Sequence, residues 1–316
     1  MKKIVVIGGG SGTFVLLKGL KKYTTELTAI CTMFDSGGST GKLRDEFGYL
    51  PPGDIRRGIL ALAPESSETR ILRELFNYRF TKGNGLTGHN FGNLLLTALK
   101  EITGDELASI EAASRLLHIK GRVLPVTLDH AQLCAELESG EIVYGETNID
   151  IPQHDTTLRI KHVFLDHKTH ALPDVLDAIN EAEIIVIGPG DLFTSIIPNF
   201  LVEGMVKALQ KSNAKKIYVC NIMTKNGETN NFQASDFLRT VETYIGSGIL
   251  THCIINTEQC SPELLQKYAT ENAKQVIVDS TILTRSDIHI ITGNFLNEKD
   301  IARHESNKLA HTLIEL

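Results

Sequence analysis

Short apolar runs rich in Val and Ile alternate along the chain with segments of helical length. Six runs predict buried parallel strands because they are apolar at nearly every position: 4–8, 27–34, 184–188, 217–221, 253–256 and 276–279. Their alternation with helical segments is typical of βαβ units. We therefore expect an α/β fold, a Rossmann-like three-layer α/β/α arrangement around a mainly parallel sheet.

The segments between these strands carry apolar residues at helical spacing. The predicted helices cover residues 14–22, 196–211, 236–245 and 262–271. Ser235 and Ser261 stand at expected N-cap positions, and Pro262 follows as a first helical residue, where its missing N–H has no intrahelical partner to lose. Helices should therefore cover the sheet.

One stretch, residues 65–118, is mostly helical in pattern. Its candidate helices are 68–78, 93–101 and 106–118. We expect this helical insertion to form one wall of a cleft.

Residues 132–146 have a different pattern, with two alternating runs around Ser139 and Gly140. Such a pattern predicts a β-hairpin, which we expect to extend the sheet with antiparallel strands or to form a flap. The sequence contains no internal repeat and no obvious linker, so we expect a single domain over residues 1–316.

Composition narrows the class of protein. The chain has 42% hydrophobic and 22% charged residues and a formal net charge of −6, which argues against bulk nucleic-acid binding. Its apolar runs are strand-sized, and the first of them stops at three glycines, so we expect no membrane span, no secretory signal and a cytoplasmic location. The five cysteines contain no CxxC pair, which indicates buried thiols rather than a disulfide framework or a zinc site.

A first glycine-rich loop, which we call loop 1 (residues 8–13), follows the first predicted strand and opens a helix. Its candidate phosphate-binding residues are Gly9, Gly10, Ser11, Gly12 and Thr13. Counted from Gly8, the GxGxxG pattern meets Thr13 where its third glycine would stand, and no GKS or GKT follows. Loop 1 thus predicts a phosphate-binding turn that is neither a full dinucleotide fingerprint nor a P-loop. The alternative is a tight turn without a ligand.

A second glycine-rich loop, loop 2 (residues 35–42), follows the second predicted strand. Its small and hydroxyl-bearing residues suit a second phosphate or a metal ion, and the candidates are Asp35, Ser36, Gly37, Gly38, Ser39 and Thr40. The alternative is that Asp35 only caps a turn. A dehydrogenase rarely needs a second glycine-rich loop here, where its ribose-binding acid is expected.

Two polar motifs follow loop 2. Asp54 and Arg56 lie after a rigid Pro-Pro-Gly turn, and Arg56 could grip phosphate. If Asp35 and Asp54 face each other, they form a plausible Mg²⁺ site completed by diphosphate oxygens. The motif from 88 to 93 supplies His89, Asn90 and Asn93 for a sugar, a base edge or proton transfer, although a lone His is more often structural.

A third glycine-rich loop, loop 3 (residues 188–195), repeats the arrangement of loop 1. Its candidates are Gly188, Pro189, Gly190 and Asp191, and Asn221 ends the next predicted strand. Ligands of open parallel sheets bind beyond the carboxyl ends of the strands. The loops together predict one pocket for a nucleotide-containing small molecule.

With these motifs assembled, the order IGGGSG, FDSGGSTGKLRDEFGYLPPGDIRRGILAL, GHNFGNL and IGPGDLFTSIIPN resembles the CofD-like superfamily (UPF0052), in its bacterial YvcK-type branch of gluconeogenesis factors. The resemblance runs from Lys3 to the last helix. It implies a Rossmann-like fold, binding of UDP-sugars such as UDP-N-acetylglucosamine, and a role in growth on gluconeogenic carbon sources and in cell shape. It also implies that Tyr268 stacks on uracil and Arg303 meets phosphate; without it, both would be surface residues.

The resemblance leaves two functions open. The leading hypothesis is a regulator that binds a nucleotide sugar and whose ligand-bound surface a protein partner recognises. We expect such a regulator to be non-catalytic. The alternative is a 2-phospho-L-lactate transferase with a guanosine diphosphate donor, for which Asp35, Asp54 and His89 are the catalytic candidates. The transferases carry an Asp-rich, His-containing segment where this chain has DSGGSTG, which disfavours the second. A nicotinamide oxidoreductase is disfavoured, because loop 1 lacks the third glycine and loop 2 has glycines where a ribose site is expected; an NAD-like ligand in the crevice stays among the expected ligands, beside a UDP-sugar or GDP. We also expect a homo-oligomer.

Overall fold

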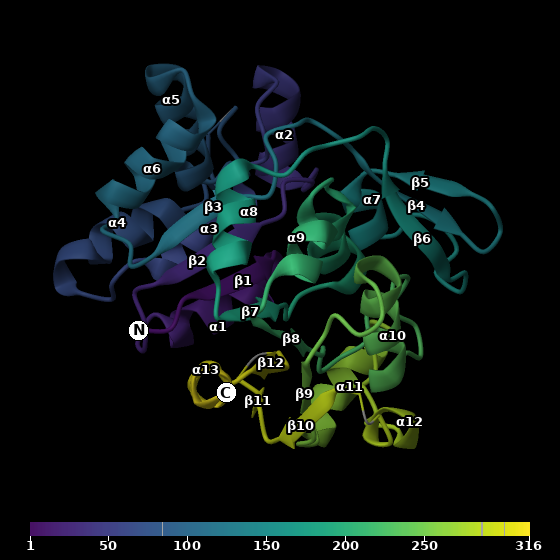
Figure 1. Cartoon of the computed structure of the whole chain (residues 1–316). Helices are drawn as coiled ribbons and strands as arrows, with labels where there is room; N and C mark the ends of the chain where they lie inside the picture. Colours follow the sequence, from purple (N-terminus) through teal and green to yellow (C-terminus); the bar gives the residue numbers. More distant parts are fainter. Residues whose placement is uncertain (84, 286, 300) are drawn as a thin grey trace.

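A seven-stranded sheet forms the centre of the computed structural model, which describes residues 1–83, 85–285, 287–299 and 301–316 (Figure 1). The strand order is β10-β9-β8-β7-β1-β2-β3, and every neighbouring pair is parallel. The strands are β1 Ile4–Gly8, β2 Leu27–Cys31, β3 Arg122–Pro125, β7 Ile184–Ile187, β8 Lys215–Val219, β9 His252–Asn256 and β10 His289–Gly293. The predicted α/β fold with a parallel sheet is confirmed.

The strand order reverses between β1 and β7. From β1 the chain continues outward through β2 to β3, and it then returns to β7 on the other side of β1. Every residue of β1, β2 and β7 is buried, as their continuous apolar runs predict. Such a reversal opens a crevice at the carboxyl ends of the two central strands, where loops 1 and 3 begin.

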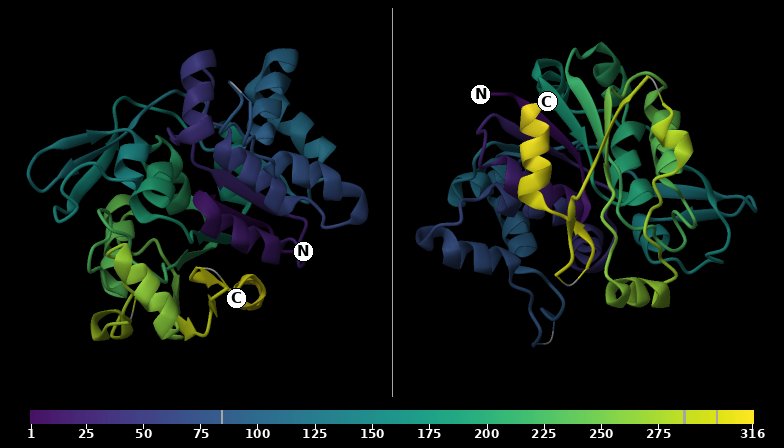
Figure 2. Two further views of the ribbon diagram at one scale, coloured as in Figure 1. Left: turned by 180° about the vertical axis from the view of Figure 1, so that it is seen from behind. Right: turned by 90° about the horizontal axis from the view of Figure 1, so that it is seen from below.

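Helices cover both faces of the sheet. On one face, α1 Gly10–Leu20 packs against α3 Gly53–Leu62 and α13 Ser306–Glu315 (Figure 2). On the other, α8 Pro173–Glu181 and α10 Ala234–Ile245 both contact α9 Met205–Lys211 (Figure 1). These two layers and the sheet between them make the three-layer arrangement.

The helical insertion is confirmed as α4 Ser67–Asn77, α5 Phe91–Thr103 and α6 Glu106–Leu116. Side chains of Ser66, Asn90 and Asp105 cap the three amino termini by accepting backbone N–H groups. The three helices pack on α3. The insertion therefore rests on the same helix that carries Asp54 and Arg56.

The predicted strand at 276–279 is wrong. These residues run as a loop whose backbone bonds to other loops, for example from the Val276 N–H to the carbonyl of Ile222, and Ile277 is 62% exposed. The place beside β9 belongs to β10, which the sequence pattern missed, as it missed β3 at the opposite edge. Both are edge strands with mixed burial, so neither shows a continuous apolar run. The predicted second strand also ends early, at Cys31.

The hairpin is confirmed, but it does not extend the main sheet. Strands β4 Leu133–Leu137 and β5 Ile142–Tyr144 pair antiparallel and join β6 Ile160–Leu165 in a separate three-stranded sheet. The short helix α7 Glu146–Asp150 follows β5 and returns the chain toward the crevice (Figure 1).

The predicted helix at 196–211 is wrong as one element. It is divided into a π-helical turn Leu192–Ile196, a 3₁₀ turn Ile197–Leu201 and α9, because Pro198 cannot donate a backbone hydrogen bond. The N-cap of α10 is Gln233 and not Ser235, since Asp236 completes a capping box with Gln233. Ser261 does cap α11 Pro262–Thr270, as predicted.

The remaining elements are α2 Gly38–Phe47, α12 Ser280–Leu283 and the strand pair β11 Leu296–Asn297 with β12 Arg303–His304. All five cysteines are buried and have free thiols. Among the described residues, no helix has the length and apolarity needed to cross a membrane.

Candidate functional site

Loops 1 and 3 lie against each other. The hydroxyl of Thr13 donates to the carbonyl of Pro189 at 2.9 Å, and a Cβ added to Gly12 would stand 2.7 Å from that same oxygen. Real Cβ atoms do not approach so closely, so glycine is required at position 12. The contact follows from the fold, because β1 and β7 are neighbours and both loops leave their carboxyl ends.

Loop 1 becomes the first turn of α1. Gly10 begins the helix with a φ of +68°, a backbone conformation that favours glycine, and its N–H donates to the carboxylate of Asp54 at 3.2 Å. The N–H groups of Ser11 and Gly12 also belong to the first turn, which has no preceding carbonyls to bond. A helix amino terminus of this kind favours negative charge.

A pocket of about 430 Å³ opens beside loops 1 and 3. It is lined by Ser11 and Gly12 of loop 1, by Pro189 to Asp191 of loop 3, and by residues 221–226 after β8. The other walls come from α7, the end of α11 and the segment from 301 to 304. Six segments that are separated in sequence therefore meet in one cavity.

Tyr268 and Arg303 line this same pocket. The hydroxyl of Tyr268 accepts the backbone N–H of Ala302 at 3.1 Å, so it fixes the residue before Arg303. The Tyr268 ring packs on a small apolar cluster that includes Ile222 and Leu264. Arg303 itself is exposed. The two residues that the resemblance singled out are thus held together and next to loops 1 and 3.

Asn221 follows β8 and bonds to loop 3. Its side-chain N–H donates to the carbonyl of Gly190 at 2.8 Å, while its side-chain oxygen is buried and accepts no hydrogen bond. Both residues line the pocket.

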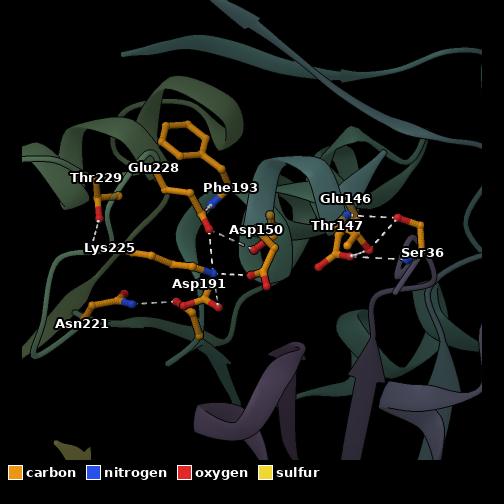
Figure 3. A network of polar contacts seen from close by, with 12 residues as sticks. Ser36, Glu146, Thr147, Asp150, Asp191, Phe193, Asn221, Lys225, Glu228 and Thr229 are labelled. Carbon is orange, nitrogen blue, oxygen red and sulfur yellow. Dashed lines mark hydrogen bonds and ion pairs between the residues drawn. The ribbon is translucent and has the colours of Figure 1, made fainter. Parts of the chain in front are cut away.

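Lys225 lies at the centre of an acidic cluster, which we call the Lys225 cluster (Figure 3). Its ammonium contacts Asp150 of α7, Asp191 of loop 3 at 3.0 Å and Glu228 at 2.8 Å. Glu228 has a fully buried side chain and also accepts the backbone N–H of Phe193 at 3.3 Å. The cluster therefore ties α7 and the loop after β8 to loop 3.

The charges of the Lys225 cluster do not balance. Burial alone lowers the pKa of Lys225, but the attraction of the three carboxylates outweighs it and holds that pKa above its ordinary value. Burial raises the pKa of Glu228, and the attraction of Lys225 opposes this rise only in part. One ammonium faces three carboxylates, so the cluster leaves excess negative charge on this side of the pocket.

Asp150, Asp191 and Glu228 could hold a metal ion, since one carboxylate oxygen from each lies within 4.8 Å of the others. The cation at their centre in this structure is the Lys225 ammonium. The predicted pair Asp35 and Asp54 is not part of this triad and lies elsewhere along the rim.

Helix α7 connects the Lys225 cluster to loop 2 (Figure 3). At its other end, Thr147 donates its backbone N–H to the hydroxyl of Ser36 at 3.0 Å, and Glu146 accepts the backbone N–H of Ser36 at 3.3 Å. Loop 2 does not line the pocket, but it contacts α7, whose other end does.

Asp35, Asp54 and Glu146 form a second group of carboxylates between loop 2 and α3. Burial raises the pKa of Asp54 to about 6, and Asp35 adds to the rise while Arg57 opposes it. Burial and Asp35 together raise the pKa of Glu146 to about 8. A Cβ on Gly53 would stand 2.8 Å from an Asp35 carboxylate oxygen, which places Asp35 beside the amino end of α3. Asp35 and Asp54 therefore lie close enough for their charges to interact.

The other predicted site residues bond to one another. Arg56 donates to the side chain of Asn93 at 2.9 Å and to the carbonyl of Phe76, and Asn93 donates to the hydroxyl of Thr40. The Ser39 hydroxyl lies 3.3 Å from Nδ1 of His89 and accepts the backbone N–H of Asn90. The network is buried, and it joins α2 and α3 to α5. Its members hold these helices together and line no part of the pocket.

Sequence reasoning missed Glu146, Asp150, Glu228 and His304. Glu228 follows the predicted strand 217–221, so a search for charged residues after each predicted strand would have found it. Glu146 and Asp150 could not be found in this way, because they follow a hairpin that was expected to extend the main sheet and not to return the chain to the crevice.

The chain is similar to known proteins over nearly its whole length. The family described as 2-phospho-L-lactate transferase CofD matches residues 4–296. A gluconeogenesis factor of Halalkalibacterium halodurans is 43% identical over 316 residues, which cover 99% of this chain and 96% of that protein. A gluconeogenesis factor of Bacillus subtilis is 41% identical over 316 residues, with 99% and 98% covered. A crystal structure of a UPF0052 family member from Bacillus halodurans matches with a TM-score of 0.93 at 41% identity, over 99% of this chain and 100% of the other.

Proposed function

This chain belongs to the CofD family, and from that premise we propose that it is a gluconeogenesis factor that binds a nucleotide sugar of the UDP-N-acetylglucosamine type. As a regulator, it would be required for growth on gluconeogenic carbon sources and for normal cell shape. The observation that carries the proposal is the pocket in which loops 1 and 3 meet Tyr268 and Arg303.

The diphosphate of the ligand would bind at the amino end of α1. The N–H groups of Ser11 and Gly12 belong to a helix turn that favours anions, and the exposed Arg303 adds a positive charge at the same pocket. Gly12 and Gly190 let the two loops pack closely beside this site, since a side chain at either would crowd the opposite loop.

The nucleoside would lie near Tyr268. Its ring lines the pocket and is fixed by its hydroxyl, and a fixed aromatic face can stack on a base at low entropic cost. The bond from Ala302 to Tyr268 also couples this residue to the position of Arg303. Base stacking and phosphate binding would therefore depend on each other.

Asp35 and Asp54 would take a Mg²⁺ ion. The two carboxylates lie close together, the pKa of Asp54 is raised, and Gly10 of loop 1 bonds directly to Asp54. Oxygen ligands of this kind suit Mg²⁺, which keeps several waters and binds phosphate oxygens. A cation there would also favour the charged form of Glu146, whose pKa burial and Asp35 raise.

A protein partner would recognise the ligand-bound form of the chain. α7 links the pocket to the three-stranded sheet through Asp150, so a ligand that moves Asp191 or Lys225 also acts on that sheet. We also propose that the chain forms a homo-oligomer and is located in the cytoplasm.

A 2-phospho-L-lactate transferase remains the second candidate, supported by the family match and the Asp35–Asp54 pair. It would need a base near the reacting atoms. His89 is buried and engaged by Ser39, and it does not line the pocket, which favours the regulator.

A thermal-shift series tests the proposal. We expect UDP-N-acetylglucosamine to raise the melting temperature more than GDP, NAD or F420 precursors, because a ligand that binds the native state stabilises it by mass action. A separate assay with lactyl diphosphoguanosine and a deazaflavin acceptor should release no GMP. Acceptor-dependent GMP would establish the transferase instead.

A further inference from the structure

One side of the pocket is lined by carboxylates. Asp150 and Asp191 line the pocket as part of the Lys225 cluster, and Glu271 lines it from the end of α11. The fully buried Glu228 stands behind them. The ligand that fills this side must therefore bring O–H or N–H donors, because carboxylates repel phosphate oxygens.

An independent observation in the same pocket points the same way. His304 lines the pocket and is 6% exposed, and its Nε2 atom is buried without a hydrogen-bond partner. Burial lowers the pKa of His304 to about 4, although its hydrogen bond to the Cys220 backbone opposes this, so the ring is neutral. A neutral imidazole that donates through one nitrogen accepts through the other. Nε2 is thus an acceptor that awaits a donor.

Asn221 adds a second unpartnered acceptor. Its amide N–H is engaged by Gly190, which leaves its side-chain oxygen buried and without a partner in the same wall. A buried polar atom without a partner destabilises the fold, and such atoms are kept mainly where a ligand or a function uses them.

We propose that Asp150 and Asp191 determine which outer group the pocket accepts: they take hydrogen bonds from a neutral, hydroxyl-rich group on the outer phosphate and reject ligands with extra negative charge at that end. This inference rests on the proposed function and adds the residues that select the outer group and the charge that they exclude. Hydroxyl groups of a hexose donate to the carboxylates, whereas a free terminal phosphate or a uronic acid carboxylate is repelled.

Two ligands that differ at one carbon provide the test. UDP-glucose ends in a neutral CH₂OH group where UDP-glucuronic acid has a carboxylate. We expect isothermal titration to give at least tenfold weaker binding of UDP-glucuronic acid, and weaker binding of UDP and UTP as well. Added salt should narrow the gap, because screening weakens repulsion between partly exposed charges.

Variants assign the effect to the cluster. Asp191→Asn and Asp150→Asn should each cut the preference for UDP-glucose over UDP-glucuronic acid at least threefold, while Asp155→Asn, a control in an exposed turn, should not change it. The side chain of Asp191 is 44% exposed, so Asp191→Asn should fold even if Asp150→Asn does not.

Different outcomes separate this inference from the proposed function. If no UDP-sugar binds, the proposed function fails and the inference fails with it. If UDP-glucose and UDP-glucuronic acid bind within threefold of each other, or if Asp191→Asn leaves their ratio unchanged, the inference alone is overturned. Equal binding of UDP and UDP-glucose with Mg²⁺, but not with EDTA, would also overturn it, because a metal would then neutralise the outer phosphate.

Discussion

The carboxylate of Asp54 accepts the backbone N–H of Gly10 across 3.2 Å, and this bond joins the Pro-Pro-Gly motif to the first turn of α1. Asp54 therefore takes up one of the N–H groups that a helix offers to an anion, and the N–H groups of Ser11 and Gly12 remain for a ligand. The bond places the proposed Mg²⁺ ligand directly beside the proposed phosphate site.

Stability of the free chain should fall as pH rises from about 4.5 to 8. Glu146 has a folded pKa of about 8 against an ordinary value of 4.5, so over this range the folded state holds a proton that the unfolded chain has lost. Glu146→Gln cannot ionise, and it should flatten this decline and raise the free energy of unfolding at pH 8 by on the order of 1 kcal/mol. Urea denaturation at pH 4.5 and pH 8 measures both slopes.

Glu141→Gln, an exposed change on the hairpin, is the control for this prediction. A Glu146→Gln variant that shows the wild-type pH dependence would mean that Glu146 is not the group that titrates.

Gly12→Ala should separate loops 1 and 3. The new Cβ would meet the carbonyl of Pro189, and the backbone must shift to relieve the contact. We expect a loss of about 1–3 kcal/mol of stability and loss of UDP-sugar binding, measured by thermal unfolding with and without ligand. Ser11→Ala, one residue away, should cost less on both counts because the Ser11 side chain is exposed. Equal ligand affinity in Gly12→Ala and wild type would mean that binding does not require the contact between loops 1 and 3.

Arg303→Ala should weaken UDP-sugar binding at least tenfold, since a charge-assisted hydrogen bond to phosphate is worth about 1.5–3 kcal/mol. Stability should change by no more than about 0.5 kcal/mol because Arg303 is exposed. Tyr268→Phe should weaken binding less, through the lost bond to Ala302. Calorimetric titration, with Arg70→Ala on α4 as the control, decides whether Arg303 belongs to the site.

Lys225→Met should be strongly destabilising. It leaves Asp150, Asp191 and the buried Glu228 without their cation, and breaking a buried ion pair from one side costs about 3–5 kcal/mol. Adding Glu228→Gln should restore part of this loss, so the two changes should not be additive in denaturant unfolding. Additive effects would mean that Lys225 and Glu228 are not coupled.

The sequence predicted the central strands well because burial on both faces leaves an unbroken apolar run, as in β1 and β7. It failed at β3 and β10, whose edge positions dilute that signal, and at 276–279, where a short apolar run lies in a loop. Gly12 and Gly190 were predicted as loop residues and meet at the pocket. Ser39 and His89 carried the same kind of signal, yet they bond to each other, because residue type alone does not reveal whether a polar side chain faces a ligand or a neighbour.

The most direct test of a phosphate site shared by loops 1 and 3 is a crystal structure of the chain with UDP-N-acetylglucosamine. We expect the diphosphate at the amino end of α1, within hydrogen-bond distance of the Ser11 or Gly12 N–H groups and of Arg303. A diphosphate bound away from both loops, for example in the groove between α6 and β3, would contradict this placement.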